Sequence, residues 1–269
     1  MAFSILTLIN WLTPKDAGSR RLASDVPYGP DDRQTLDIYG PTGTAGPHPV
    51  VFFVYGGSWS DGDKGNYEFV GRALAAQGYV TVIADYRLIP EIEYPDFLVD
   101  CSEAFDWVTR EIAAHGGDAT RMALMGHSAG AYNAMMLLLD PQYLAARGHS
   151  GRIKAMVGLS GPYDFLPFDG PISLRTFGAV GHPATTQPIN QPVDNAPPML
   201  LASGDRDTLV YPRNTAALSK KLRAAGREVT ELHYPELGHP GTLLTLGRLA
   251  RGRAPVFADC VAFLARHLK

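Results

Sequence analysis

The 269-residue chain is 45% hydrophobic and 19% charged, a composition that excludes disordered and fibrous proteins and is typical of globular ones. Its formal net charge of −3 gives no reason to expect nucleic acid or an anionic membrane as a partner. A chain of this length buries about three quarters of its unfolded surface, so its folding requires neither a disulfide nor a metal.

The first twelve residues are apolar, and their hydrophobic side chains recur at helical spacing. These are Phe3, Ile5, Leu6, Leu8, Ile9 and Leu12. We predict a helical segment over residues 1–20 that packs on the domain or on a second subunit, with a peripheral membrane foot as the alternative. Because the segment has no basic n-region or A-x-A site and is too short to span a bilayer, we expect a cytoplasmic protein.

Predicted strands and helices alternate from residue 34 onward. Seven segments have the pattern of strands, several of them continuous apolar runs bounded by turn residues: 34–39, 50–55, 79–84, 122–125, 153–159, 199–202 and 229–234. Five segments are predicted helices: 66–77, 95–115, 129–139, 212–225 and 254–268. This order predicts a single α/β domain over residues 1–269, with a mostly parallel sheet and helices on both faces.

One stretch, residues 161–198, interrupts the alternation because it is rich in proline and carries several aromatic residues in its first half. We interpret it as a small, cap-like insertion over the carboxyl edge of the sheet, where open α/β folds bind ligands. Tyr163, Phe165 and Phe168 from this stretch, together with Trp59, are candidate walls of a substrate pocket. Simple core packing is the alternative for each of them.

The candidate nucleophile is Ser128, in the G-x-S-x-G sequence of residues 126–130. This sequence follows a predicted strand and opens a predicted helix. A sharp strand-to-helix turn needs glycines on both sides, because the chain crowds itself there, and it presents the serine hydroxyl at the top of the sheet. The context is therefore more informative than the pattern alone.

A serine hydroxyl is a weak nucleophile until a base accepts its proton. His239 is the candidate base, because it lies in a loop after the last predicted strand. His233 lies within that strand and His267 on the terminal helix, so both are weaker candidates. His127 neighbours Ser128 but is expected to point away from it.

The third member should be an acid that precedes the histidine and follows the strand at 199–202. Asp207 is favoured, because it heads the loop in a G-x-x-D-x-x-V spacing. Asp205, which directly follows Gly204, is the alternative and is expected to be a turn or salt-bridge residue.

Backbone donors for an oxyanion are expected from two places. Gly56 and Gly57 follow the buried strand at 50–55, and glycines allow the backbone to approach a substrate without a Cβ in the way. The N–H of Ala129, next to the nucleophile, is the third candidate.

We predict no metal and no other cofactor. The eight histidines are scattered, and two cysteines cannot form a Cys-based metal site by themselves. Cys101 and Cys260 lie in predicted amphipathic helices and are expected to be buried thiols.

Taken together, these segments resemble the α/β-hydrolase superfamily, and within it the esterase branch of hormone-sensitive-lipase-like and small carboxylesterase proteins. The matching segments stand in family order: YGGSW (55–59), DYRLIPE (85–91), GHSAG (126–130), GDRDTLV (204–210) and GHPG (238–241). The resemblance implies an eight-stranded, mostly parallel sheet and a Ser/Asp/His mechanism with an acyl-enzyme intermediate.

Two features distinguish this chain within the resemblance. Tyr55 stands where the family usually has His before the two glycines, and we expect it to orient the loop without abolishing activity. Trp59 followed by Gly-Asp-Lys at 62–64 is more similar to small carboxylesterases, feruloyl esterases and kynurenine-formamidase-like proteins than to lipases. The charges of the Asp-Tyr-Arg motif at 85–87 are expected to brace the oxyanion loop.

We therefore predict a serine carboxylesterase that hydrolyses short-chain esters. Three alternatives stay open: an arylformamidase-like amide hydrolase, a prolyl-oligopeptidase-type peptidase and a non-catalytic ligand-binding module. The expected partner is a small-molecule ester. Neither nucleic acid nor a membrane is an expected partner, and a homodimer through the N-terminus or terminal helix stays open.

Overall fold

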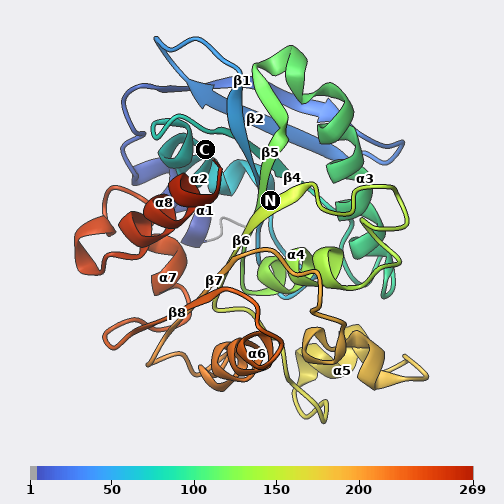
Figure 1. Cartoon of the computed structure of the whole chain (residues 1–269). Helices are drawn as coiled ribbons and strands as arrows, with labels where there is room; N and C mark the ends of the chain where they lie inside the picture. The colour runs from blue at the N-terminus through green and yellow to red at the C-terminus, as the bar shows by residue number, and fades with distance from the viewer. Residues whose placement is uncertain (1–4, 269) are drawn as a thin grey trace.

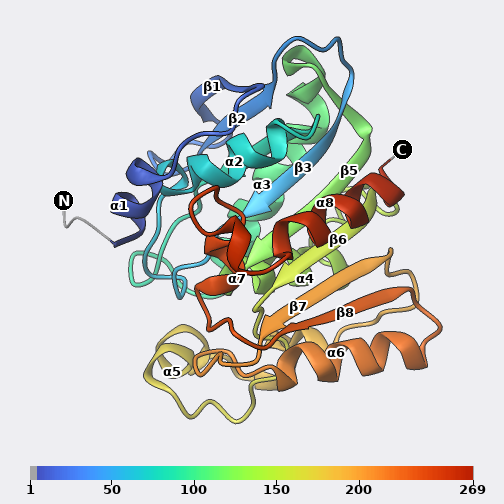
Figure 2. The same cartoon turned by 90° about the vertical axis from the view of Figure 1, so that its left-hand side faces the viewer.

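The computed structural model describes residues 5–268 as a sheet of eight strands flanked by helices (Figures 1 and 2). The strands are β1 (Ser19–Pro27), β2 (Thr35–Pro41), β3 (His48–Val54), β4 (Val80–Ala84), β5 (Gly117–His127), β6 (Ile153–Leu159), β7 (Met199–Gly204) and β8 (Val229–Tyr234). The α-helices are α1 (Ile5–Leu12), α2 (Glu68–Ala75), α3 (Asp96–Glu111), α4 (Ala129–Leu139), α5 (Pro171–Phe177), α6 (Arg213–Ala224), α7 (Gly241–Leu244) and α8 (Val256–His267).

The strand order is β1-β2-β4-β3-β5-β6-β7-β8. The pairs of β2 with β1 and with β4 are antiparallel, and all pairs from β4 to β8 are parallel. The prediction of a mostly parallel α/β sheet is confirmed. Because β3, β5, β6, β7 and β8 run in one direction, the loops after them meet at one edge of the sheet.

The central strands are buried because helices cover both faces of the sheet. Helices α2 and α8 lie on one face, and α3 and α4 lie on the other (Figures 1 and 2). Every residue of β4 is at most 4% exposed. This explains why the middle strands appear in the sequence as continuous apolar runs rather than as an alternating pattern.

Strand β1 contradicts the prediction of a helical segment over residues 1–20. Within residues 5–20 the chain is helical only in α1 (Ile5–Leu12), and β1 already begins at Ser19. The sequence of β1, SRRLASDVP, is polar because the strand lies at the sheet edge with several exposed residues. An edge strand of this kind is specified by its pairing with β2, which no local hydrophobic pattern indicates.

Helix α1 packs on the segment around residue 65. The Asn10 side chain donates to the Gly65 carbonyl oxygen at 2.9 Å and accepts from the Phe69 N–H at 3.1 Å. The outer face of α1 is apolar, with Trp11 77% exposed. Phe3 of the predicted apolar cluster lies outside the described residues. Within residues 5–268, no helix combines the length and apolarity needed to cross a bilayer.

Both cysteines are unpaired and buried, as expected. Cys101 lies on α3 and Cys260 on α8. Burial raises the pKa of each thiol, so neither has the thiolate character of a reactive cysteine.

Candidate active site

Ser128 lies in a strained turn between the end of β5 and the start of α4. Its φ of 55° and ψ of −128° are rare for a residue with a side chain. The two glycines of the motif permit this turn. A Cβ on Gly130 would lie 2.1 Å from the Val54 carbonyl oxygen, and one on Gly126 would lie 2.5 Å from that of Gly130. The sequence therefore folds here only with glycine at both positions.

The three residues predicted as a triad lie in hydrogen-bond contact. His239 Nε2 is 2.8 Å from Ser128 Oγ, and His239 Nδ1 is 2.7 Å from Asp207 Oδ2. Each residue follows a different parallel strand: β5, β7 and β8. The shared strand direction thus brings together residues that lie far apart in the sequence.

Asp207 is held with its carboxylate directed at the imidazole. Its Oδ1 accepts the backbone N–H groups of Leu209 at 3.0 Å and Val210 at 2.8 Å, which leaves Oδ2 for His239. Burial alone would raise the pKa of Asp207, but the hydrogen bond and charge of His239 and these two N–H groups outweigh it. The net result is a lowered pKa, so the carboxylate is ionised at neutral pH.

Asp205, the alternative acid, lies elsewhere. Its Oδ1 is 3.2 Å from Nδ1 of His233, on the exposed side of β8. The separation of the two aspartates follows from the turn after β7, which buries Asp207 and exposes Asp205. The interpretation of Asp205 as a local partner of another residue agrees with this geometry.

His127 was expected to point away from Ser128, and its ring contacts His239 instead. The ring centroids of His127 and His239 are 5.0 Å apart, and Nε2 of His127 is 3.0 Å from the His239 carbonyl oxygen. The sequence pattern could not show this, because the direction of the His127 side chain depends on the strained backbone of the next residue.

The loop after β3 is folded tightly against the nucleophile. A Cβ on Gly56 would lie 2.9 Å from that of Ser128, and Gly57 has a φ of 137° with the Asp61 carbonyl oxygen 2.0 Å from the position of a Cβ. Both positions therefore require glycine. Ser58 lines the same pocket as Ser128 and Ala129, a role that the sequence did not suggest.

Asp85 braces this loop, as its strand-end motif led us to expect. Its Oδ1 accepts from the Tyr55 hydroxyl at 2.6 Å and from the Lys64 N–H at 2.7 Å, and its Oδ2 accepts from Lys64 Nζ at 3.1 Å. Arg33 donates to the Tyr55 hydroxyl at 3.0 Å. Tyr55 therefore takes part in a buried network that fixes the chain directly before the glycines.

We expect Asp85→Asn to lower the free energy of unfolding by about 2–3 kcal/mol. Burial raises the pKa of Asp85, whereas the charge of Lys64 opposes that rise by stabilising the carboxylate. The substitution removes this carboxylate and leaves the buried Lys64 without one of its two partners. Lys64 keeps Asp25 at 2.8 Å, which limits the loss. Urea unfolding measures the loss in the free energy of unfolding, and Asp32→Asn, at an exposed position, is the control. Equal stability of the two variants would show that the network does not hold the loop.

The pocket beside Ser128 has a volume of about 340 Å³. Two of the four predicted wall residues, Trp59 and Phe165, line it. Tyr163 is fully buried, with its hydroxyl 2.1 Å from the position of a Cβ on Gly158, so it packs on β6 instead. Phe168 stacks on Phe177 at 5.7 Å and is not among the lining residues.

Several further residues of the pocket wall were not predicted. They come from the connection after β6, including the first turn of α5, and from the loop after β7: Pro162, Asp169, Gly170, Pro171, Ile172, Ser173, Leu209 and Val210. Most belong to the irregular stretch at 161–198, which the sequence placed at this edge of the sheet. Their individual orientations depend on loop conformation, which has no periodic signal in the sequence.

Comparison with known proteins gives the family. The model of the BD-FAE family matches residues 36–222, more than half of the chain. The chain belongs to the BD-FAE family. This membership confirms the resemblance to α/β-hydrolase esterases.

Named relatives of this BD-FAE-family chain are esterases. Esterase LipC of Mycobacterium tuberculosis is 33% identical over 244 residues, which cover 81% of this chain and 60% of LipC. Isoprenylcysteine alpha-carbonyl methylesterase ICME of Arabidopsis thaliana is 37% identical over 151 residues, which cover 54% of this chain and 35% of ICME. The chain thus spans only part of the length of these relatives.

Solved structures show the same fold. The thermophilic carboxylesterase EstE1, cloned from a metagenomic library, superposes with a TM-score of 0.80 at 18% identity and covers 98% of this chain and 94% of its own. Esterase B from Lactobacillus rhamnosis superposes with a TM-score of 0.78 at 19% identity, and the match covers 97% of this chain and 90% of esterase B. At these identities the likeness establishes the α/β-hydrolase fold of the BD-FAE-family chain.

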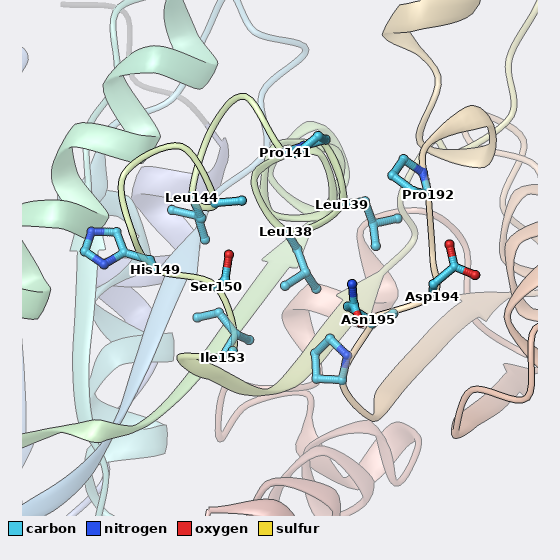
Figure 3. Close-up of a pocket in the computed structure, with 14 residues that line it drawn as sticks. Leu138, Leu139, Pro141, Leu144, His149, Ser150, Ile153, Pro192, Asp194 and Asn195 are labelled. Carbon is cyan, nitrogen blue, oxygen red and sulfur yellow. The ribbon is translucent and has the colours of Figure 1, made fainter.

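A larger cavity, of about 530 Å³, lies away from the triad (Figure 3). Its walls include residues 149–151 and 194–197, which directly precede β6 and β7, and Ile153, the first residue of β6. It therefore lies at the amino ends of the parallel strands, opposite the edge that carries Ser128. The larger cavity of this BD-FAE-family fold is therefore not the one that Ser128 lines.

Proposed function

We propose that this chain is a serine carboxylesterase that hydrolyses short-chain esters through an acyl-enzyme intermediate. The observation that carries the proposal is the pair of hydrogen bonds that joins Ser128 through His239 to Asp207 beside a pocket. The relatives named as esterases support the same class of reaction.

In the proposed reaction, His239 Nε2 accepts the Ser128 proton while Oγ attacks the ester carbonyl carbon. Asp207 holds the proton of Nδ1 and so keeps Nε2 free to act as the base, and its charge stabilises the imidazolium. His239 then donates the proton to the leaving alcohol. Water, activated by the same imidazole, hydrolyses the acyl-serine and releases the acid.

The proposed oxyanion donors are the backbone N–H groups of Gly56, Gly57 and Ala129. We add Ser58 to this set, because it lines the pocket together with Ala129. Such donors stabilise the tetrahedral intermediate most when they are fixed before reaction, and the network around Asp85 supplies that rigidity. Loss of one donor typically costs about 10²- to 10³-fold in rate.

The proposed preference for short acyl chains rests on the modest pocket. Its walls carry bulky groups from Trp59 and Phe165, within a volume of about 340 Å³. We expect kcat/KM for p-nitrophenyl acetate or butyrate to exceed that for the decanoate by about tenfold or more. Assay of the series from acetate to dodecanoate tests this, and a decanoate optimum would contradict it.

The same assay tests the class of reaction. Turnover of esters, combined with fluorophosphonate labelling of Ser128, is the expected result. If no ester is hydrolysed, N-formylkynurenine and aminoacyl anilides distinguish the formamidase and peptidase alternatives, and absence of labelling would favour a binding module.

Three further expectations stay predictions: a single domain over residues 1–269, a cytoplasmic location and a possible homodimer.

A further inference from the structure

A second histidine contacts the loop that carries His239. His127 is 5% exposed, and its Nε2 lies 3.0 Å from the His239 carbonyl oxygen. A carbonyl oxygen can only accept, so Nε2 of His127 carries the proton and donates it. This bond holds the backbone of His239, whose ring remains free to contact Ser128 and Asp207.

The other side of His127 contacts the loop after β3. A Cβ on Gly56 would lie 3.5 Å from Nδ1 of His127 and 2.9 Å from its carbonyl oxygen. His127 therefore fills the space between the glycine loop and the His239 loop. A substitution of His127 would therefore affect the distance between the glycine loop and the His239 loop.

His127 is neutral where the triad would operate. Burial and, to a smaller extent, the neighbouring His239 lower the pKa of His127 to about 3, although the hydrogen bond to the His239 carbonyl oxygen and the charge of Asp207 raise it. His127 thus adds no positive charge beside an imidazolium at position 239. A neutral donor is also the form that the hydrogen bond requires.

We propose that His127 is a positioning residue: its hydrogen bond to the His239 carbonyl oxygen keeps His239 Nε2 directed at Ser128 Oγ. This inference rests on the proposed function, since it takes His239 as the base. The Thr242 hydroxyl reaches the same carbonyl oxygen at 3.4 Å, so His127 makes the shorter of the two contacts.

The test compares two substitutions at this position. His127→Phe keeps the ring volume and removes the donor, whereas His127→Gln keeps an N–H donor. The matched control is His149→Phe, because His149 is also a buried histidine, with Nε2 2.9 Å from Asp106, but lines the remote cavity (Figure 3). Steady-state kinetics on p-nitrophenyl butyrate, the rate of fluorophosphonate labelling and thermal unfolding are measured for each.

We expect His127→Phe to lower kcat about 10- to 100-fold with KM changed less than about twofold, and to slow labelling in parallel, because displacement of a catalytic group by about 1 Å has effects of this size. His127→Gln should recover most of the loss, and His149→Phe should keep wild-type kcat. Full activity of His127→Phe, or equal losses in the Phe and Gln variants, would overturn the proposal.

A measurement on the wild-type protein avoids any folding defect of the variants. The ¹⁵N chemical shifts of His127 report its tautomer, and we expect the neutral Nε2–H form between pH 5 and 8. An Nδ1–H tautomer would exclude the donor role. Failure of the proposed function is distinguishable, because the wild type would then neither hydrolyse esters nor be labelled at Ser128.

Discussion

Asp207→Asn should lower kcat for ester hydrolysis by about 10³- to 10⁴-fold while the protein stays folded. The side-chain oxygen of Asn can still accept the N–H groups of Leu209 and Val210, which Oδ1 of Asp207 accepts now. Its NH₂ group would then face His239 Nδ1, where Oδ2 lies at present. An N–H donor at that point favours the imidazole tautomer with the proton on Nε2, which cannot accept the Ser128 proton.

Asp205→Asn is the matched control, because it changes the same type of residue two positions away. Asp205 contacts His233 rather than His239, so we expect kcat within about twofold of wild type. Steady-state kinetics with p-nitrophenyl butyrate separates the two variants. If Asp205→Asn were the inactive one, the acid of the proposed triad would be wrongly assigned.

The lowered pKa of Asp207 also determines how its contribution to stability depends on pH. A carboxyl whose folded-state pKa is depressed stabilises the fold above its unfolded pKa of about 3.9, and that contribution is lost as the pH falls through the folded value. The contribution is therefore fully present at neutral pH. In Asp207→Asn it is absent at every pH.

Ser128→Ala should abolish the hydrolysis of every ester, with a fall in kcat on the order of 10⁴- to 10⁶-fold. The substitution removes the hydroxyl oxygen that lies 2.8 Å from His239 Nε2. What remains is the binding and electrostatic contribution of the pocket and the proposed oxyanion donors. The same variant should not react with a fluorophosphonate.

Ser203→Ala is a stringent control for the nucleophile. Ser203 is also a buried serine whose hydroxyl lies near a histidine, with Oγ 3.3 Å from His233 Nδ1. It lies within β7 rather than on a strained turn, and it is not among the residues that line the pocket of Ser128. We expect full labelling and full activity in this variant, and residual labelling of Ser128→Ala would point to a second reactive serine.

Much of the fold could be predicted from the sequence, because its signals are local. The continuous apolar runs of the central strands reflect burial on both faces, and α4 begins and ends as predicted at residues 129 and 139. Strand β1 could not be predicted, because its polar residues satisfy an edge position that only the pairing with β2 defines. The short helices α5 and α7 likewise lie in segments without hydrophobic periodicity.

The candidate site divides in the same way. Ser128, Asp207 and His239 could be identified, because each lies in a short motif at a fixed place after a strand. The orientation of His127 and the burial of Tyr163 could not, because they depend on backbone torsions and on packing between segments distant in sequence. The individual wall residues from the irregular stretch at 161–198 could not be predicted either, because this stretch has no hydrophobic periodicity.

Different segments of the fold carry the proposed catalytic groups and the pocket wall. The proposed chemistry depends on the ends of β5, β7 and β8, whereas much of the pocket wall comes from the connection between β6 and β7. That connection joins two strands already paired to each other in the sheet. Substitutions of the wall residues of this connection should therefore change which acids and alcohols fit without moving the groups proposed to cleave the bond, while buried residues such as Tyr163 hold the connection on the sheet.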